Sequence, residues 1–399
     1  MRILFITPEI PYAPDTGAKI RIYSLLKNLA SRNQVSLISF DREPENPSRI
    51  TALKEICADV IAVPLSERGR LGNKRVRQLR SLVSRYPYQY FAYHSPEMQR
   101  TIDRFVSAHP VDVVDVEYSQ MGYYTLPHHT RRVLSLHNVE HELLYRNFLK
   151  SRSPLRRIYN YVEWRKFRRQ ELEVCRKFSM CLTTSERDKR VIAADLPTTP
   201  LAVIPNGVDT RFFKPDAEES GDDHTIVFTG TIDYYPNIDG LTYFVEEVLP
   251  LVRQQIPGVR FFIVGKDPPP AIRRYGRDPG IVVTGTVDDV RGYFRKTTAV
   301  VVPLRIGGGT RLKILEAMAM GKPVVSTAVG AEGLEVADGE NILIADDPPG
   351  MARALISVLR DRALRERLAG AGRKLVEERY DWTSIANRLE RAYSSLLGG

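Results

Sequence analysis

Cysteine is scarce in this chain. Only three of its 399 residues are cysteine (Cys57, Cys175 and Cys181), so they cannot all pair with one another. None of them stands in a Cys-x-x-Cys or Cys/His spacing that would indicate a zinc site. The composition therefore favours a reducing cytoplasm and argues against a structural zinc ion.

Long apolar runs are absent as well. No charge-free apolar stretch is long enough for a membrane-spanning helix. The apolar run at the start ends at Thr7-Pro8 and has no basic leader, so it is too short for the core of a secretory signal. Internal repeats and low-complexity tracts are also lacking. A length of 399 residues and a hydrophobic content of 43% are enough for two domains, each with its own core.

Acidic residues are outnumbered only in the first half of the chain. Residues 1–205 hold 33 basic and 21 acidic residues, a balance of +12, whereas the remainder holds 25 and 27, a balance of −2, so the whole positive excess lies in the first half. Basic residues gather at 68–85 and 146–177, and aromatic residues intersperse the second segment. This pattern is typical of a helix on an anionic membrane surface. It also fits nucleic-acid binding or a solvated helix face.

Short apolar segments alternate twice with helical patterns. The first series opens with a strand at 3–6 and a helix at 22–29, and the second opens with a strand at 225–230. Such alternation predicts parallel, doubly wound α/β sheets. The polar segment 213–223, broken by proline and glycine, is the best linker between the two series.

A glycine run at 307–309 follows a valine-rich strand at 299–302 and opens onto a helix. Backbone N–H groups and the positive end of the helix dipole converge at such a point, which favours phosphate binding. Arg311 and Lys313 add full positive charges there. Glu316, about one turn further along, is placed to accept hydrogen bonds from sugar hydroxyls. The alternative is a glycine-rich turn with a solvated helix start.

Four stretches together resemble the retaining, nucleotide-sugar-dependent glycosyltransferases of family 4. They are residues 3–8 with Gly17, 182–186, 204–209 and 307–323, and they follow the order of the family. The resemblance implies the GT-B fold, with two facing Rossmann-like doubly wound domains and a cleft between them. It assigns residues 1–207 to an acceptor-binding domain and 208–379 to a donor-binding domain. The helix at 380–399 is expected to pack back on the first domain.

The resemblance also distributes the donor-binding roles. Ligands of open α/β sheets bind at the carboxyl ends of the strands, where several glycine-bearing loops occur in the second half. The base is expected near residues 285–287, the ribose at Glu316, and the diphosphate at residues 309–311 with Lys313. The full predicted donor set is Gly17, Gly230, Gly285, Thr286, Val287, Gly308, Gly309, Thr310, Arg311, Lys313 and Glu316.

Catalytic and acceptor-side roles follow from the same resemblance. His137 follows a strand and resembles the active-site histidine loop of the family. Retaining transfer without a protein nucleophile depends on positioning the reactants and on stabilising the leaving diphosphate, so His137, Arg311 and Lys313 are the predicted catalytic residues. A structural histidine remains the alternative. His137 and His141 lack a third ligand, so we expect no metal and no cofactor. The predicted acceptor-side residues are Asp15, Lys19 and Arg21.

Two positions depart from the family pattern. Gly308 stands where the family usually has the first of two glutamates, so sugar selectivity cannot be read there. Residues 230–239 lack the Arg and Lys that the family commonly places after the first strand of the second domain. Arg311 and Lys313, with Lys266 as a further candidate, or backbone dipoles must then hold the diphosphate. Asn237 is either a helix N-cap or a ligand residue, and Asp239 is similarly ambiguous.

The sequence therefore predicts a cytoplasmic glycosyltransferase that acts on lipid-linked or polysaccharide acceptors in cell-envelope or exopolysaccharide synthesis. Because the family often extends lipid-linked acceptors, we expect peripheral binding to the inner face of the cell membrane and no binding of nucleic acid. The alternatives are a sugar-nucleotide epimerase of the same fold and a basic nucleic-acid-binding protein. The predicted membrane-facing residues are Arg165, Lys166, Arg168 and Arg169.

Overall fold

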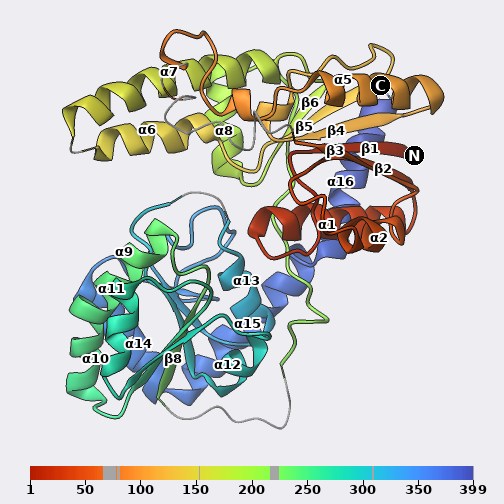
Figure 1. Ribbon diagram of the computed structural model, residues 1–399. Helices are drawn as coiled ribbons and strands as arrows, with labels where there is room; N and C mark the ends of the chain where they lie inside the picture. The colour runs from red at the N-terminus through yellow and green to blue at the C-terminus, as the bar shows by residue number, and fades with distance from the viewer. Residues whose placement is uncertain (66–77, 79–80, 152, 216–223, 308–309, 399) are drawn as a thin grey trace. The chain divides into compact units, whose positions relative to one another are not determined.

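The computed structural model describes residues 1–65, 78, 81–151, 153–215, 224–307 and 310–398 (Figure 1). The chain forms two compact units. The first comprises Met1–Pro205 with Ile385–Gly399, and the second comprises Asn206–Ser384. Most of the predicted linker at 213–223 and most of the basic segment 68–85 lie outside the described residues.

The first unit is built on a parallel sheet with the strand order β3-β2-β1-β4-β5-β6-β7. The strand predicted at 3–6 is confirmed, and it pairs in parallel with residues 34–39, with Ile3 opposite Val35. The central strands are buried on both faces, which explains their continuous apolar sequence. The strands are β1 (Arg2–Thr7), β2 (Gln34–Asp41), β3 (Asp59–Pro64), β4 (Val113–Glu117), β5 (Arg131–Ser135), β6 (Met180–Thr183) and β7 (Leu201–Val203).

Helices connect these strands, and local sequence fixes where several of them begin. The Ser95 hydroxyl accepts from the backbone N–H of Met98 at 3.2 Å, and Pro96 occupies the first turn, so the α5 helix starts there. Ser185 caps α8 in the same way at 3.1 Å. The helices are α1 (Gly17–Ala30), α2 (Ser48–Lys54), α5 (Pro96–Ala108), α6 (Glu140–Lys150), α7 (Pro154–Cys175), α8 (Glu186–Asp195) and the C-terminal α16 (Trp382–Leu397).

The C-terminal helix α16 has buried polar contacts with the first sheet. The Tyr393 hydroxyl donates to the carboxylate of Asp115 on β4, and both side chains are fully buried. The Ser135 hydroxyl donates to the other oxygen of Asp115 at 2.8 Å. At the surface, Arg32 pairs with Glu390 at 2.9 Å. Tyr393 of the C-terminal helix therefore belongs to the core of the first unit.

The second unit has a parallel sheet with the strand order β10-β9-β8-β11-β12-β13. The order reverses between β8 and β11, and such a switch point leaves a crevice at the carboxyl ends of the strands. The strands are β8 (Thr225–Thr229), β9 (Arg260–Val264), β10 (Ile281–Gly285), β11 (Ala299–Val302), β12 (Val324–Ser326) and β13 (Leu343–Ile344).

Residues 235–255 do not form one continuous α-helix. A π-helical turn at Phe244–Val248 separates α9 from α10. None of the helices in the described part of the chain is long and apolar enough to cross a membrane. The helices of the second unit are α9 (Tyr235–Tyr243), α10 (Leu249–Gln255), α11 (Pro270–Arg273), the 3-10 helix η4 (Arg274–Arg277), α12 (Arg291–Lys296), α13 (Leu312–Ala319), α14 (Pro348–Arg360) and α15 (Arg362–Arg379).

Two glycines let the turns after β8 and β9 lie against each other. Gly230 and Gly265 have φ values of 147° and 153°, which side chains rarely tolerate. A Cβ on Gly265 would lie 1.7 Å from the carbonyl oxygen of Gly230. Neither turn can therefore keep its position with a side chain at residue 265.

We expect Gly265→Ala to lower the free energy of unfolding of the second unit by about 2 kcal/mol or more, since over-packing and positive φ both oppose the added methyl group. Urea denaturation measures the change. Gly292→Ala is the control, because a Cβ at residue 292 would meet no atom within 4 Å. Equal stability of the two variants would contradict the close approach of the turns.

Candidate functional site

The turn between β11 and α13 carries the first cation of the site. Arg311 is buried and occupies the N-cap position of α13. A Cβ on Gly307, whose φ is 132°, would lie 2.6 Å from Nη2 of Arg311, so the guanidinium passes over a residue that must be glycine. The Thr310 hydroxyl is buried and has no hydrogen-bond partner among the described residues. The predicted donor residues Gly308 and Gly309 lie outside the described residues.

Lys313 reaches from α13 to the turn that follows β8. Its Nζ donates to Oδ1 of Asn237 at 3.2 Å and lies 3.7 Å from the centroid of the Phe228 ring. A Cβ on Gly230 would come within 2.7 Å of the same nitrogen. Burial, reinforced by the nearby Arg311, lowers the pKa of Lys313 to about 7, although Glu316 opposes the shift.

Asn237 lies inside α9 and is not its N-cap, which is Tyr234. The N-cap interpretation of Asn237 is therefore wrong. Its buried side chain donates from Nδ2 to the backbone carbonyl of Thr231 at 2.7 Å and accepts from Lys313. Asp239 is not an N-cap either, because its carboxylate holds Arg305 at 2.8 Å.

Glu316 is half-buried on α13, about one turn after Lys313. Burial raises the pKa of its carboxyl to about 7, and the neighbouring Lys313 partly offsets the rise. The carboxylate has no side-chain hydrogen bond to a described residue. It is thus a partly buried acceptor whose oxygens are available to a ligand.

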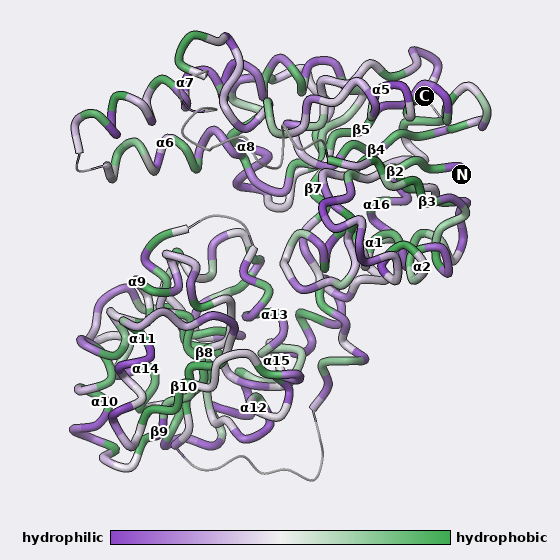
Figure 2. The backbone as a smooth tube through the Cα atoms, viewed as in Figure 1, coloured by the Kyte–Doolittle hydropathy of each residue, from purple (hydrophilic) through white to green (hydrophobic). Residues whose placement is uncertain are grey.

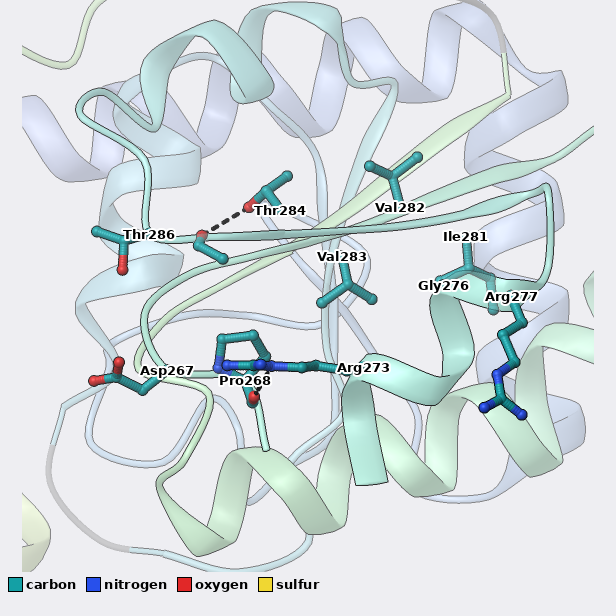
Figure 3. Close-up of a pocket in the computed structure, with 11 residues that line it drawn as sticks. Asp267, Pro268, Arg273, Gly276, Arg277, Ile281, Val282, Val283, Thr284 and Thr286 are labelled. Atoms are coloured by element: carbon teal, nitrogen blue, oxygen red, sulfur yellow. Dashed lines mark hydrogen bonds between the residues drawn. The ribbon is translucent and has the colours of Figure 1, made fainter. Parts of the chain in front are cut away.

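Gly285 and Thr286 line a cavity of about 740 Å³ along the outer edge of β10 (Figure 3). This volume is within the range of small-molecule sites. Asp267 and Thr286 lie at one end of the cavity in Figure 3, and Arg277 lies at the other. The Arg273 Nε donates to the backbone carbonyl of Pro268 at 2.6 Å. Val287, also predicted to face a base, packs partly buried against the core and is not part of the lining.

In the first unit, His137 follows β5 and is held by a carboxylate that was not predicted to touch it. Its Nε2 lies 2.5 Å from Oε2 of the fully buried Glu117 on β4. The ring stacks on Tyr118 with centroids 4.1 Å apart. His141 pairs likewise with the buried Glu171 at 2.7 Å. Two neighbouring histidines are therefore each anchored to a glutamate, and no group of three or more metal-ligating side chains occurs among the described residues.

The predicted acceptor-side residues divide between surface and core. Lys19 pairs with Asp15 at 3.0 Å beside the exposed Gly17, the first residue of α1, which was predicted for the donor site. Arg21, by contrast, is buried and donates to the backbone carbonyl of Pro205 at 2.8 Å. Burial lowers the pKa of its guanidinium. This environment fits a structural role and leaves no surface of Arg21 for an acceptor.

The four predicted membrane-facing residues on α7 do not share one environment. Lys166 turns inward and donates to the backbone carbonyl of Ser81. Arg168 pairs with Asp195, and Arg169 pairs with Glu173 at 2.8 Å. Arg165 is exposed, and among the described residues it has no acidic partner, only the ring and hydroxyl of Tyr161. The inward turn of Lys166 contradicts its predicted orientation.

The chain matches two known protein families. Residues 16–212 match the family described as Glycosyltransferase Family 4, and residues 223–361 match the family described as Glycosyl transferases group 1. The phosphatidyl-myo-inositol mannosyltransferase of Mycobacterium tuberculosis is 33% identical over 208 residues, which are 49% of this chain and 54% of that protein. The match thus spans about half the length of that relative.

Two further proteins are similar over nearly the whole chain. An uncharacterized 44.6 kDa protein from the cps region of Klebsiella pneumoniae is 23% identical over 95% of this chain and 96% of its own length. The crystal structure of Anabaena HepE in complex with UDP has a TM-score of 0.70 and 16% identity, and covers 99% of this chain and 100% of that chain. At that identity the likeness concerns the fold.

The pKa values of Lys313 and Glu316 predict that the joint contribution of these two groups to stability is lowest near pH 7. Between its ordinary value of 4.5 and its folded value of about 7, Glu316 binds more protons in the folded state, so stability falls as pH rises. Between about 7 and 10.5, Lys313 binds fewer protons in the folded state, so stability rises again.

Urea denaturation of each variant at a series of pH values measures both slopes. We expect Glu316→Gln to remove the fall in stability below pH 7. Lys313→Met should remove the rise in stability above pH 7. A Lys313→Met profile that parallels the wild type above pH 7 would contradict the burial of the charged lysine.

Proposed function

Since the chain belongs to glycosyltransferase family 4 and has the GT-B fold, we propose that it is a retaining enzyme that uses a nucleotide-diphosphate sugar. The proposed acceptor is lipid-linked or a polysaccharide, in cell-envelope or exopolysaccharide synthesis. The proposed location is the cytoplasm, at the inner face of the cell membrane.

The observation that carries the proposal is the grouping of charges at the switch point of the second sheet. Lys313 lies half-buried between Phe228 and Asn237, and Arg311 stands at the start of the same helix. Two cations that are partly removed from water favour a ligand with a compensating double negative charge, such as a diphosphate. Glu316 offers oxygens without a protein partner to the ribose hydroxyls, and the cavity beside Gly285 offers space for a base.

In the proposed reaction, the diphosphate leaves on the face that the acceptor approaches, and its oxygen takes the acceptor proton. Negative charge on the leaving group grows towards the transition state, so Arg311 and Lys313 stabilise the transition state more than the bound donor. His137, oriented by Glu117, hydrogen-bonds the donor sugar or positions the acceptor. Arg311 and Lys313 supply the positive charge in this scheme, so we propose that the transfer needs no metal and no cofactor.

The contacts of the first unit weigh against the epimerase alternative. That reaction needs available acid and base groups, but Glu117 holds His137, and Asp115 accepts from Tyr393 and Ser135. The nucleic-acid alternative gives no role to the desolvated Glu316.

We expect a nucleotide-diphosphate sugar to raise the melting temperature of the protein in a thermal-shift panel, because it binds the folded state selectively. Glu316→Ala should weaken binding of that ligand by about 10- to 100-fold, since a hydrogen bond to a charged group is lost. Calorimetry measures the affinity. Glu378→Ala, at an exposed position of α15, should leave it unchanged. Wild-type affinity in a folded Glu316→Ala variant would contradict the donor site.

The proposed membrane contact is the end of the α6–α7 hairpin, whose helices run side by side (Figure 1). Leu149, Leu155 and Ile158 there are 53%, 81% and 64% exposed. Residues 146–166 contain seven basic residues and one acidic residue, Glu163, which is buried. Figure 2 shows hydrophobic and hydrophilic residues alternating along this end. Exposed apolar side chains among cations suit an anionic lipid surface better than the α7 residues chosen from the sequence.

We expect Arg156→Gln with Arg157→Gln to reduce binding to anionic vesicles about 30-fold, since each basic residue near such a surface contributes about 1 kcal/mol. Leu155→Ser with Ile158→Ser should also release the protein. Arg168→Gln with Arg169→Gln is the matched control and should have a smaller effect, because both arginines are paired. Vesicle flotation measures binding. Equal binding to neutral and anionic vesicles, or none to either, would remove the membrane proposal.

A further inference from the structure

The turn after β8 lacks a cation of its own. Residues 230–239 contain no lysine or arginine, yet this turn lies at the switch point of the sheet, where a diphosphate is proposed to bind. The structure places one there from another element. Lys313 comes from α13, and its Nζ lies so close to Gly230 that a Cβ on that residue would be 2.7 Å away.

Three features hold the ammonium group at this place. The Phe228 ring lies 3.7 Å below Nζ, which is a favourable cation–π distance. Gly230 has no side chain to displace it. The directional contact is the 3.2 Å hydrogen bond to Oδ1 of Asn237, and it is the one hydrogen bond that Nζ donates within the described part of the chain. An ammonium group has three donors, so two remain for a ligand.

Asn237 is itself fixed in the orientation that this contact needs. Its Nδ2 donates to the backbone carbonyl of Thr231 at 2.7 Å, which leaves Oδ1 facing the lysine. The side chain is buried, and it comes from α9, the helix that follows the turn. The amide therefore links the backbone of the turn to the lysine of a helix far away in the sequence.

We propose that Asn237 is a positioning residue that holds the Lys313 ammonium at the turn after β8, so that this lysine supplies the diphosphate-binding charge that the turn lacks. The inference rests on the proposed function for the identity of the ligand. The positioning of Lys313 itself concerns the free protein.

The protonation of Lys313 makes this role measurable. Burial lowers the pKa of Lys313 to about 7, and an acceptor at 3.2 Å favours its charged form. The other charged groups that act on it are Arg311, which lowers the pKa, and Glu316, which raises it. Loss of the Asn237 acceptor should lower the pKa further, whereas a carboxylate at residue 237 should raise it.

The first experiment measures the affinity for UDP-glucose and GDP-mannose by calorimetry from about pH 6 to about pH 9. The phosphates of these probes are diesters that do not titrate in this range. Wild-type affinity should fall on the alkaline side as Lys313 loses its proton. The midpoint of that fall should move down by about one pH unit in Asn237→Ala and up by about one unit in Asn237→Asp.

Opposite shifts distinguish positioning from a merely structural role, because a damaged turn would weaken binding in both variants without moving the midpoint in opposite directions. Asp239 lies two residues further along α9, and its carboxylate holds Arg305. Asp239→Asn is therefore the control and should leave the midpoint unchanged. Lys313→Met should abolish the alkaline fall. An unmoved midpoint in both Asn237 variants would overturn the inference.

A second measurement needs no ligand. The rise in unfolding free energy that Lys313 causes above about pH 7 should begin at lower pH in Asn237→Ala and at higher pH in Asn237→Asp. If neither probe binds the wild type, the proposed donor is wrong, and the stability profiles still decide whether Asn237 controls Lys313. If the probes bind and both sets of profiles stay fixed, the inference alone fails.

Discussion

The Lys313 ammonium lies at the end of β8, where Gly230 leaves room for it and Oδ1 of Asn237 accepts a hydrogen bond from it. A buried charge without such contacts is costly, so the site depends on this arrangement. Gly265 belongs to the same constraint, since a side chain there would collide with the Gly230 carbonyl and displace the turn. The position of Lys313 in the candidate site thus depends on the close packing of the turns after β8 and β9.

The first unit also contains buried ionisable side chains, and these are carboxyl groups. Asp115 and Glu117 alternate with apolar residues on the central strand β4, and both are fully buried. Each has polar partners: Tyr393 and Ser135 for Asp115, and His137 for Glu117. Burial and the neighbouring Glu117 raise the pKa of Asp115, and the hydrogen bonds from Tyr393 and Ser135 oppose the rise. The same strand therefore ties down the C-terminal helix and orients the candidate catalytic histidine.

Much of the fold could be predicted because its signals are local. Valine-rich strands, helical apolar spacing and glycines at strand ends placed β1, β8 and β11 to within a residue or two. Short or half-buried edge strands such as β3 and β13 carry weaker patterns. The candidate site was predictable where residues are adjacent in sequence, as in Arg311, Lys313 and Glu316. Asn237 could be named but not assigned, because its partner lies 76 positions away.

Sequence by itself determined the two-sheet architecture, the glycosyltransferase family and the glycine-to-helix turn. The spacing of apolar residues, the composition and the order of motifs can all be read along the chain. Tertiary structure decided which charges lie in the candidate site and which serve the fold. Arg21 and Lys166 looked like surface cations, yet one holds the Pro205 carbonyl and the other the Ser81 carbonyl. Glu117 meets His137, and Lys313 meets Asn237, only when strands and helices distant in sequence pack together. Charge alone does not reveal such partners, because burial and distance decide what a charged side chain contacts.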